Sequence, residues 1–464
     1  MAFIDDSFLL HTPAARRLYH EYAATQPIID FHSHLSPRDI AGGRQFENLF
    51  EIWLEGDHYK WRAMRTAGVA ERFCTGDATD YEKFAAWAAT VPQTLRNPLY
   101  GWTHLELQRY FGIDELLDTS SAQGIWTRAN AQLAGPELSA SGILTRFNVQ
   151  LLYTTDDPAD PLEHHDAIRA TGSSRVLPTF RPDAVLQVDA PDRLRTWVSR
   201  LEASADVAIS SLPHLMEALT RRHQAFHDAG GRLSDHGLPY CHATPCTERE
   251  ADAIFTRALD GTAASEEEYE RFASYLMLFF GHLDHQKGWT KQLHLGARRN
   301  VNTRMARTLG RDTGFDSIGD WPQVNALAAY LDALDTEDAL PRIIIYNSNP
   351  ADNHAFATMI GNFQDGSVAG KVQFGSAWWF LDQKRGIEGQ LDELSDAGLL
   401  STFVGMVTDS RSFMSFPRHE YFRRVLCNML GAEMERGELP HDLALVGSLV
   451  ERVCYTNARD RFVP

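Results

Sequence analysis

Short runs with β-like patterns of apolar residues end in polar residues and recur along the chain, and sequence with helical character follows them. Eight of these runs are predicted to be β-strands, at residues 27–35, 148–158, 175–183, 237–244, 291–300, 342–350, 371–380 and 403–411. The fourth run is the weakest because it contains Pro239. Strands that alternate with helices are typical of parallel βαβ units. Eight such units predict an α/β fold, a closed (β/α)8 TIM-like barrel.

The interval between the first and second runs is far longer than the others. Apolar residues recur there at helical spacing, with tryptophans at positions 53, 61, 87 and 102. We expect a large helical insertion after the first strand, packed over one end of the barrel, and an N-terminal helix near residues 12–24. The predicted division is therefore an N-terminal helix with the first strand (1–35), a helical insertion (36–147) and the remainder of the barrel (148–464).

The first run, "PIIDFHSHL", ends in two histidines. Alternate residues of a strand share a face, so Asp30, His32 and His34 would all point into the barrel. The carboxyl ends of barrel strands carry the chemistry of such enzymes, and imidazole binds divalent transition metals well. Surface or hydrogen-bonded histidines are the alternative interpretation. The shared face and the barrel pattern favour half of a metal site.

A two-histidine site needs further ligands, commonly a carboxylate. The eighth run, "VGMVTDSR", ends in Asp409, and in a closed barrel the eighth strand lies beside the first. Asp409 would then reach the same metal, although an aspartate after a strand also commonly caps a helix. His294, at the end of the fifth run, is a further ligand or a substrate contact, with a core histidine as the alternative.

Arginines follow several of the runs: Arg181 in "TFRPD", Arg298 and Arg299 in "GARRN", and Arg411 in "TDSR". Any one of them alone would be read as a surface residue. Several at one barrel mouth indicate an anionic ligand, because guanidinium binds carboxylate or phosphate through two hydrogen bonds. The sequence has no glycine-rich phosphate loop, so a carboxylate is the better prediction.

Two further segments supply candidate contacts. "GDHYKWR", at residues 56–62 in the insertion, offers His58, Tyr59 and Arg62, which would fold over the site. "SAWWF" offers Trp378 and Trp379, one of which would flank a sugar ring. A place in the buried core is the alternative for each tryptophan.

The net charge of −18 disfavours nucleic acid and anionic membrane as partners, because both would repel the protein. It leaves room for a small anionic substrate where arginines gather. The five cysteines form no CxxC pair, and reduced thiols fit a cytoplasmic protein. The first residues, "MAFIDDSFLL", lack the basic start of a signal peptide. The apolar stretch at 275–281 is too short to span a bilayer.

Taken together, these motifs resemble a known family. The DxHxH signature with an aspartate ending the last strand resembles the amidohydrolase superfamily. Six segments in order resemble its uronate isomerases, also called glucuronate isomerases: "DFHSHLSP", "GDHYKWR", "PTFRPD", "LHLGARRN", "AWWF" and "TDSR". The resemblance covers essentially the whole chain. It implies aldose–ketose isomerisation of a hexuronate, D-glucuronate to D-fructuronate and D-galacturonate to D-tagaturonate.

The resemblance also implies roles for individual residues. His32, His34 and Asp409 match the metal ligands of one divalent ion, with zinc expected. Tyr59, Arg411 and His294 match active-site positions. The matched substrate contacts are His58, Arg181 and a tryptophan of the Trp378–Trp379 pair. Arg298 is a further candidate substrate contact because of its place at a strand end. A cytoplasmic homo-oligomer is expected.

Isomerisation requires proton transfer between C2 and C1 through an enediol, for which Asp409 and Tyr59 are both candidates. The sequence departs from most amidohydrolases, since the fourth run offers "YCHAT" and the sixth "YNSNP", without the usual lysine or glutamate and histidine. This departure favours one metal over a binuclear hydrolase. Two rivals stay open: a metal-dependent hydrolase of sugar-acid amides or lactones, and a barrel that binds sugar acids without turnover.

Overall fold

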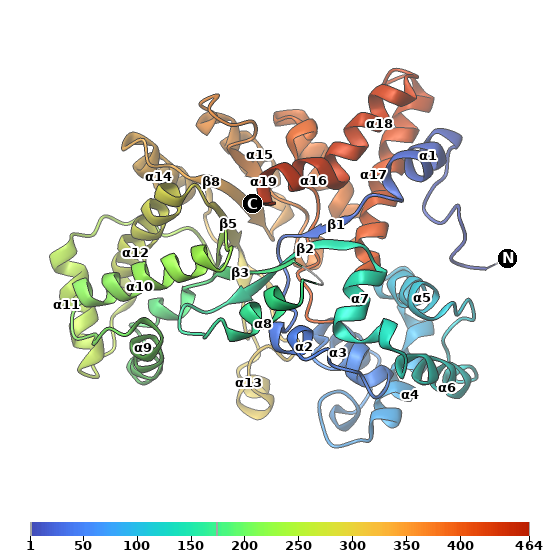
Figure 1. Cartoon of the computed structure of the whole chain (residues 1–464), viewed down its shortest axis with the longest axis horizontal. Helices are drawn as coiled ribbons and strands as arrows, with labels where there is room; N and C mark the ends of the chain where they lie inside the picture. The colour runs from blue at the N-terminus through green and yellow to red at the C-terminus, as the bar shows by residue number, and fades with distance from the viewer. Residues whose placement is uncertain (1, 173–174, 464) are drawn as a thin grey trace.

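The computed structural model describes residues 2–172 and 175–463. A curled parallel sheet of seven strands forms the centre, in the order β1-β2-β3-β4-β5-β8-β9. Its strands are β1 (Ile28–Asp30), β2 (Val149–Asp156), β3 (Arg175–Phe180), β4 (Leu233–Leu238), β5 (Thr290–Leu295), β8 (Arg342–Asn347) and β9 (Val372–Phe374). Helices surround this sheet (Figure 1). The fold is the predicted α/β, TIM-like barrel.

The helices follow the strands in chain order. They are α1 (Pro13–Leu18), α2 (Pro37–Ala41), α3 (His58–Thr66), α4 (Asp80–Thr90), α5 (Pro98–Phe111), α6 (Ala122–Leu133), α7 (Ala140–Arg146), α8 (Glu163–Thr171), α9 (Pro191–Ala205), α10 (Leu212–Asp228), α11 (Glu248–Leu259), α12 (Glu266–Lys287), α13 (Thr303–Leu309), α14 (Val324–Thr336), α15 (Asn353–Ile360), α16 (Lys384–Ala397), α17 (Pro417–Arg436), α18 (Leu443–Glu451) and α19 (Asn457–Phe462). Among the described residues, no helix combines the length and apolar character needed to cross a lipid bilayer.

The prediction of an eighth strand at residues 403–411 is wrong. Residues 403–410 run as extended coil beside the end of β1, and no ladder forms there in the described chain. Two backbone hydrogen bonds still close the ring, from Asp409 N–H to the His32 carbonyl (3.2 Å) and from His34 N–H to the Ser410 carbonyl (3.0 Å). Gly405 and Asp409 have left-handed φ values of 85° and 47°, which interrupt a regular strand.

Two other predicted strands have different bounds in the structure. β4 ends at Leu238, so the run at 237–244 was placed too late, and Pro239 follows the strand. The β4 sequence, "LSDHGL", was passed over because its polar residues are buried rather than exposed. β1 spans only Ile28–Asp30, so both histidines lie just beyond its end. The N-terminal helix begins at Pro13 as α1 and continues as a π-helical turn, Tyr19–Ala23.

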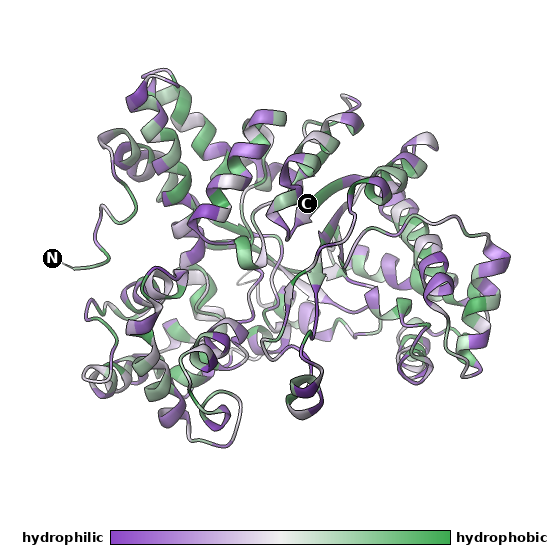
Figure 2. Cartoon of the chain, turned by 180° about the vertical axis from the view of Figure 1, so that it is seen from behind, coloured by the Kyte–Doolittle hydropathy of each residue, from purple (hydrophilic) through white to green (hydrophobic). Residues whose placement is uncertain are grey.

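The chain between β1 and β2 holds helices α2 to α7, drawn in blue to cyan beside the barrel in Figure 1. Their tryptophans belong to the main hydrophobic core, in which Trp53 and Trp87 are fully buried and Trp102 is 4% exposed. The N-terminus of α3 faces the barrel, which brings residues 58 and 59 to the strand ends. Figure 2 shows α13, by contrast, as a mostly hydrophilic helix standing away from the sheet.

The opposite end of the barrel is closed by the C-terminal helix α19. Phe462 stacks on Phe31 with ring centroids 4.6 Å apart, and the Tyr153 hydroxyl donates to the Phe462 carbonyl at 3.0 Å. Apolar side chains from the strands, including Leu233 and Ile344, complete this inner cluster. The floor of the barrel is therefore a packed core.

Candidate active site

A cavity of about 550 Å³ opens at the carboxyl ends of the strands. The last coil segment, the insertion and the loop after β5 all contribute to its wall. The lining includes nearly every residue singled out from the sequence: His32, His34, His58, Tyr59, Arg181, His294, Arg299, Trp378, Trp379, Asp409 and Arg411. This is where barrel enzymes place their chemistry.

Two histidines and an aspartate form the centre of the cavity. The Nε2 atoms of His32 and His34 each lie 3.1 Å from Asp409 Oδ1. The Trp378 indole N–H donates to the other oxygen of Asp409 at 2.8 Å. His32 is 1% exposed, whereas His34 and Asp409 keep 25% and 19% of their side-chain surface open to the cavity.

Asp30 places Asp409 within this group. The buried Asp30 carboxylate accepts from the Thr408 backbone N–H (3.0 Å) and from the Thr408 hydroxyl (2.5 Å). These bonds tie the last coil segment to β1. Burial raises the pKa of Asp30 to about 6, and the bonds from Thr408 limit that rise. Asp30 therefore positions Asp409 indirectly, through its hydrogen bonds with Thr408.

The electrostatics of the group suit a cation. Burial lowers the pKa of His34 to about 4, so its ring is neutral near pH 7 and keeps a free lone pair. Burial raises the pKa of Asp409, but hydrogen bonds from His32 and His34 outweigh it and hold the pKa well below its usual range. One ligand atom from each of the three residues lies within 4.8 Å of the others. Two imidazoles and a carboxylate fit one divalent transition metal.

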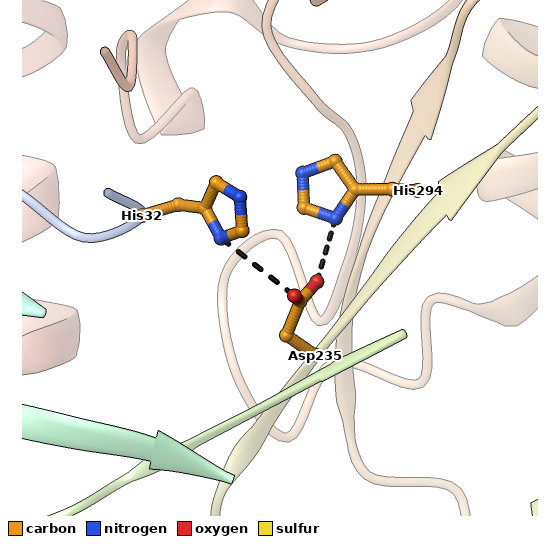
Figure 3. A group of neighbouring side chains, drawn as sticks. All are labelled: His32, Asp235 and His294. Carbon is orange, nitrogen blue, oxygen red and sulfur yellow. Dashed lines mark hydrogen bonds and ion pairs between the residues drawn. The ribbon is translucent and has the colours of Figure 1, made fainter. Parts of the chain in front are cut away.

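Asp235, on β4, is the site residue that the sequence did not reveal (Figure 3). Its Oδ1 is 2.6 Å from His294 Nδ1, and its Oδ2 is 3.9 Å from His32 Nδ1. Because Asp235 accepts a hydrogen bond from the His294 Nδ1–H group, the Nε2 atom of His294 is left as a hydrogen-bond acceptor. That atom is buried and has no partner among the described residues. Burial lowers the pKa of His294, which keeps the ring neutral.

Arg181 lines the cavity, but its guanidinium is already engaged by the protein. Nε lies 3.2 Å from Asp183 Oδ2, and Nη1 lies 3.0 Å from Asp235 Oδ2. Nη2 packs so tightly on Gly237 that a Cβ there would lie 2.1 Å away. Burial lowers the pKa of Arg181, but the two carboxylates reverse this and raise it.

The insertion delivers two aromatic rings to the cavity. Asp57 caps α3 and accepts from the backbone N–H groups of Tyr59 and Lys60, both at 3.0 Å. The rings of His58 and Tyr59 stack with centroids 4.6 Å apart. Burial, followed by nearby carboxylates including that of Asp409, raises the pKa of Tyr59 well above its usual value, so the phenol keeps its proton.

The loop after β5 forms an arm, residues 297–318, over the cavity rim. It contains α13 between two short antiparallel strands, β6 (Ala297–Arg298) and β7 (Ser317–Ile318). Arg298 is exposed, lies 5.9 Å from the centre of the Trp321 ring and is not part of the cavity wall. Its neighbour Arg299 does line the cavity, stacks over Trp379 at 4.9 Å and pairs with Asp316 at 3.3 Å.

Comparison with known proteins agrees with this arrangement. Residues 1–462 match the family model of glucuronate isomerase. A uronate isomerase of Solibacter usitatus is 60% identical over 460 residues, 99% of this chain and 98% of the relative. One from Opitutus terrae is 59% identical over 461 residues, 99% and 97% of the two chains.

Solved structures show the same likeness. The uronate isomerase of Thermotoga maritima matches with a TM-score of 0.93 and 32% identity over 100% of both chains. The glucuronate isomerase of Caulobacter crescentus matches with a TM-score of 0.92 and 26% identity, over 99% of this chain and 97% of that one.

The fold and its cavity define a TIM-like barrel enzyme that acts on a small molecule. Within that class, the chain belongs to the glucuronate isomerase family and is a uronate isomerase.

Proposed function

We propose that the enzyme interconverts D-glucuronate with D-fructuronate and D-galacturonate with D-tagaturonate by proton transfer through an enediol. The observation that carries this proposal is the His32–His34–Asp409 cluster inside a cavity that also holds unpaired arginines. A cavity of about 550 Å³ lies in the range that binds small polar ligands. The family membership supports the reaction class.

His32, His34 and Asp409 are proposed to hold one divalent metal ion, with zinc expected. When bound, such an ion polarises substrate oxygens as a Lewis acid. The β8 sequence, "RIIIYN", contains no histidine, which supports one ion rather than two. The corrected β4 offers Asp235 and His236 in place of "YCHAT". His32, Asp235 and His294 form a second group whose ligand atoms lie within 4.8 Å of one another. We propose that Asp235 supports the site rather than binding a metal, because its carboxylate already contacts Arg181 and His294.

Asp409 is the proposed proton carrier. Its carboxylate is ionised at neutral pH, which is the state that accepts the C2 proton and returns it to C1. Tyr59 keeps its phenol proton and would donate a hydrogen bond to a substrate oxygen. Arg411 follows Asp409 by two residues and would stabilise the negative charge of the enediolate.

The remaining wall residues orient the substrate. The free Nε2 of His294 would accept a hydrogen bond from a sugar hydroxyl. His58, Trp378 and Trp379 would pack against the sugar carbons. Because the guanidinium of Arg181 is held by two carboxylates, its proposed duty is to fix Asp235 rather than to bind substrate directly.

A cytoplasmic location is proposed because all five cysteines are free thiols. The homo-oligomer stays a prediction, which analytical ultracentrifugation would check.

Turnover in heavy water tests the reaction. Metal-loaded enzyme with D-glucuronate or D-galacturonate should form the ketose and incorporate deuterium at C1, because the carried proton exchanges with solvent. A ketose without deuterium would indicate a direct hydride shift from C2 to C1 instead of proton transfer. Hydrolysis of a uronolactone or a sugar-acid amide without ketose formation would favour the hydrolase alternative instead.

A further inference from the structure

A cluster of buried polar residues lies behind the active site, in the layer between the strands β4 and β5 and the helix α12. Side chains alternate along a strand, so Asp235 of β4 points into the barrel while Ser234 and His236 point outward. The Ser234 hydroxyl accordingly donates to Asp284 Oδ2 of α12 at 2.6 Å. The ammonium group of Lys291, on β5, lies 2.7 Å from the same carboxylate oxygen. The outer face of the sheet therefore carries charged groups at this point.

The charges of this cluster are not explained by stability alone. Asp284 and Lys291 form an ion pair that is almost completely buried, and His236 beside them is fully buried. A buried ion pair is weak evidence for stability, because the cost of removing two charges from water offsets much of their attraction. Apolar side chains of similar size would fill the same layer without that cost. The contacts that the cluster makes toward the active site are therefore informative.

Lys291 determines which nitrogen of His236 carries the proton. The Lys291 ammonium group lies 2.9 Å from His236 Nε2, and an ammonium group can only donate a hydrogen bond. Nε2 is therefore the acceptor, and the proton lies on Nδ1. Burial, reinforced by the charge of Lys291, lowers the pKa of His236, so the ring is neutral near pH 7. The Nδ1–H group then donates to Asp183 Oδ1 at 3.0 Å.

Asp183 continues this contact over the end of β4 toward the cavity. Its Oδ2 accepts from the Gly237 backbone N–H at 2.8 Å and from Arg181 Nε at 3.2 Å. Arg181 in turn contacts Asp235 at 3.0 Å, and the last link, from Asp235 to His294, is drawn in Figure 3. The continuous series of hydrogen bonds and ion pairs runs, in order, through Lys291, His236, Asp183, Arg181, Asp235 and His294.

We propose that His236 is a positioning residue for the isomerase: its hydrogen bond to Asp183 fixes the Arg181 guanidinium behind the active site. The proposal rests on the proposed function, in which Arg181 fixes Asp235 and Asp235 leaves His294 Nε2 free to accept from a sugar hydroxyl. Without the donor on residue 236, Asp183 loses a hydrogen bond that holds it beside Arg181. His236 itself is not part of the cavity wall and acts only through this series.

The test measures kcat/KM for D-glucuronate in the full-length enzyme with excess zinc. His236→Leu removes the donor to Asp183, so kcat/KM should fall by about tenfold or more, the scale typical of residues that orient an active-site ligand. His236→Asn places an amide N–H group about where the histidine Nδ1–H group lies, and it should recover most of that loss. If His236 only filled space, the smaller asparagine would not rescue activity.

A double-mutant cycle shows whether His236 acts through Arg181. In an Arg181→Met background the series is already broken, so His236→Leu should lower kcat/KM by less than about twofold further. An independent structural effect would lower kcat/KM by the same factor in both backgrounds. Should His236→Leu not fold, Asp183→Asn weakens the same link at a partly exposed side chain, and it should lower kcat/KM only where Arg181 is present.

His242→Leu is the matched control. His242 is as fully buried as His236 and likewise presents Nδ1 to a carboxylate, that of Glu270 at 2.6 Å, and it too lies outside the cavity wall. Its contact with Glu270 is not part of the series that reaches Arg181. His242→Leu should therefore leave kcat/KM within about twofold of the wild type, even where the free energy of unfolding falls.

Three results would overturn the inference: His236→Leu with the wild-type kcat/KM, a loss that is equally large in the Arg181→Met background, or an equal loss in His242→Leu. A different result would contradict the proposed function instead. If Arg181→Met alone keeps the wild-type kcat/KM, Arg181 does not serve the reaction by fixing Asp235. Wild-type enzyme that converts neither hexuronate would overturn the proposed reaction itself.

Discussion

The two ends of the barrel differ in the kind of side chains and backbone that they contain. At the floor, the buried aromatic rings of Phe31 and Phe462 stack with their centroids 4.6 Å apart. At the mouth, several residues have left-handed backbone, and some buried polar atoms have no partner in the described structure. Four of the nine non-glycine residues with left-handed φ in the described chain line the cavity: Asn300, Asp312, Trp379 and Asp409. Buried atoms without a protein partner, such as His294 Nε2, lie there too.

This difference suggests that the residues of the floor determine the stability of the fold, whereas the residues of the mouth determine catalysis. Strained residues and unpaired buried groups each cost free energy, typically 1–3 kcal/mol, and persist only where the surrounding structure holds them. The floor consists mainly of packed apolar side chains. We therefore expect substitutions at the mouth to change catalysis while the fold survives, and substitutions at the floor to do the reverse.

Asp409→Asn should give the largest effect on the mouth. The change removes the charge that helps hold the metal and the group that moves the proton, so turnover should fall by roughly 10²- to 10⁴-fold. The thermal midpoint should change little, because the Asp409 side chain caps no helix here. Ketose formation and calorimetry on the same sample measure the two quantities. A fully active variant would remove Asp409 from the mechanism.

Phe462→Ala tests the floor. Removing a fully buried ring leaves a cavity, and the free energy of unfolding should fall by about 3 kcal/mol. The kcat for ketose formation at 25 °C should stay close to that of the wild type. Urea unfolding measures the first effect, and Phe462→Leu, which keeps most of the volume, should lose much less. A large drop in kcat with normal stability would break the proposed separation of the two ends.

The Asp156→Asn variant tests whether a buried carboxyl group at the mouth makes the stability of the protein depend on pH. Burial raises the pKa of Asp156, at the cavity end of β2, to about 7. The folded state therefore binds this proton more tightly than the unfolded chain, so its stabilising contribution is full below about pH 4 and is lost as pH rises to about 7. Between pH 5 and pH 8 the wild type should lose roughly 2 kcal/mol more stability than Asp156→Asn.

Urea unfolding at the two pH values measures this difference. Asp77→Asn, at a side chain that is 94% exposed, is the control and should follow the wild type. Equal pH dependence in Asp156→Asn and the wild type would show that the Asp156 carboxyl is not held protonated at the mouth.

The sequence predicted most of the fold because buried parallel strands have a local signature. β2 and β8 contain apolar runs, "LLY" and "IIIY", and their positions agree with prediction to within a few residues. β4 lacks that signature, since Ser234, Asp235 and His236 are polar yet fully buried. Their partners lie far away in the chain: Lys291 contacts His236 across 55 residues. No local pattern reports such a network.

The residues of the candidate site were also predictable only where a local sequence pattern marks them. The histidine pair and Asp409 were predicted from strand ends, and the structure brings them together even though the eighth strand is coil. Asp235 was missed with its strand. Arg298 was predicted as a substrate contact because it lies close to a strand end, whereas the structure places it beside Trp321 and outside the cavity wall. Arg311, which does line the cavity, was not predicted. Sequence order does not specify the direction of side chains on an arm.

A metal titration tests the central claim most directly. The enzyme is stripped with a chelator, and zinc is restored stepwise while ketose formation from D-glucuronate and bound metal are measured together. Activity should be lost in the stripped enzyme and should return in full at about one equivalent of zinc. His34→Asn should bind less metal and stay inactive at that ratio. Full ketose formation by the stripped enzyme, or unchanged metal binding and activity in His34→Asn, would contradict the assignment of His32, His34 and Asp409.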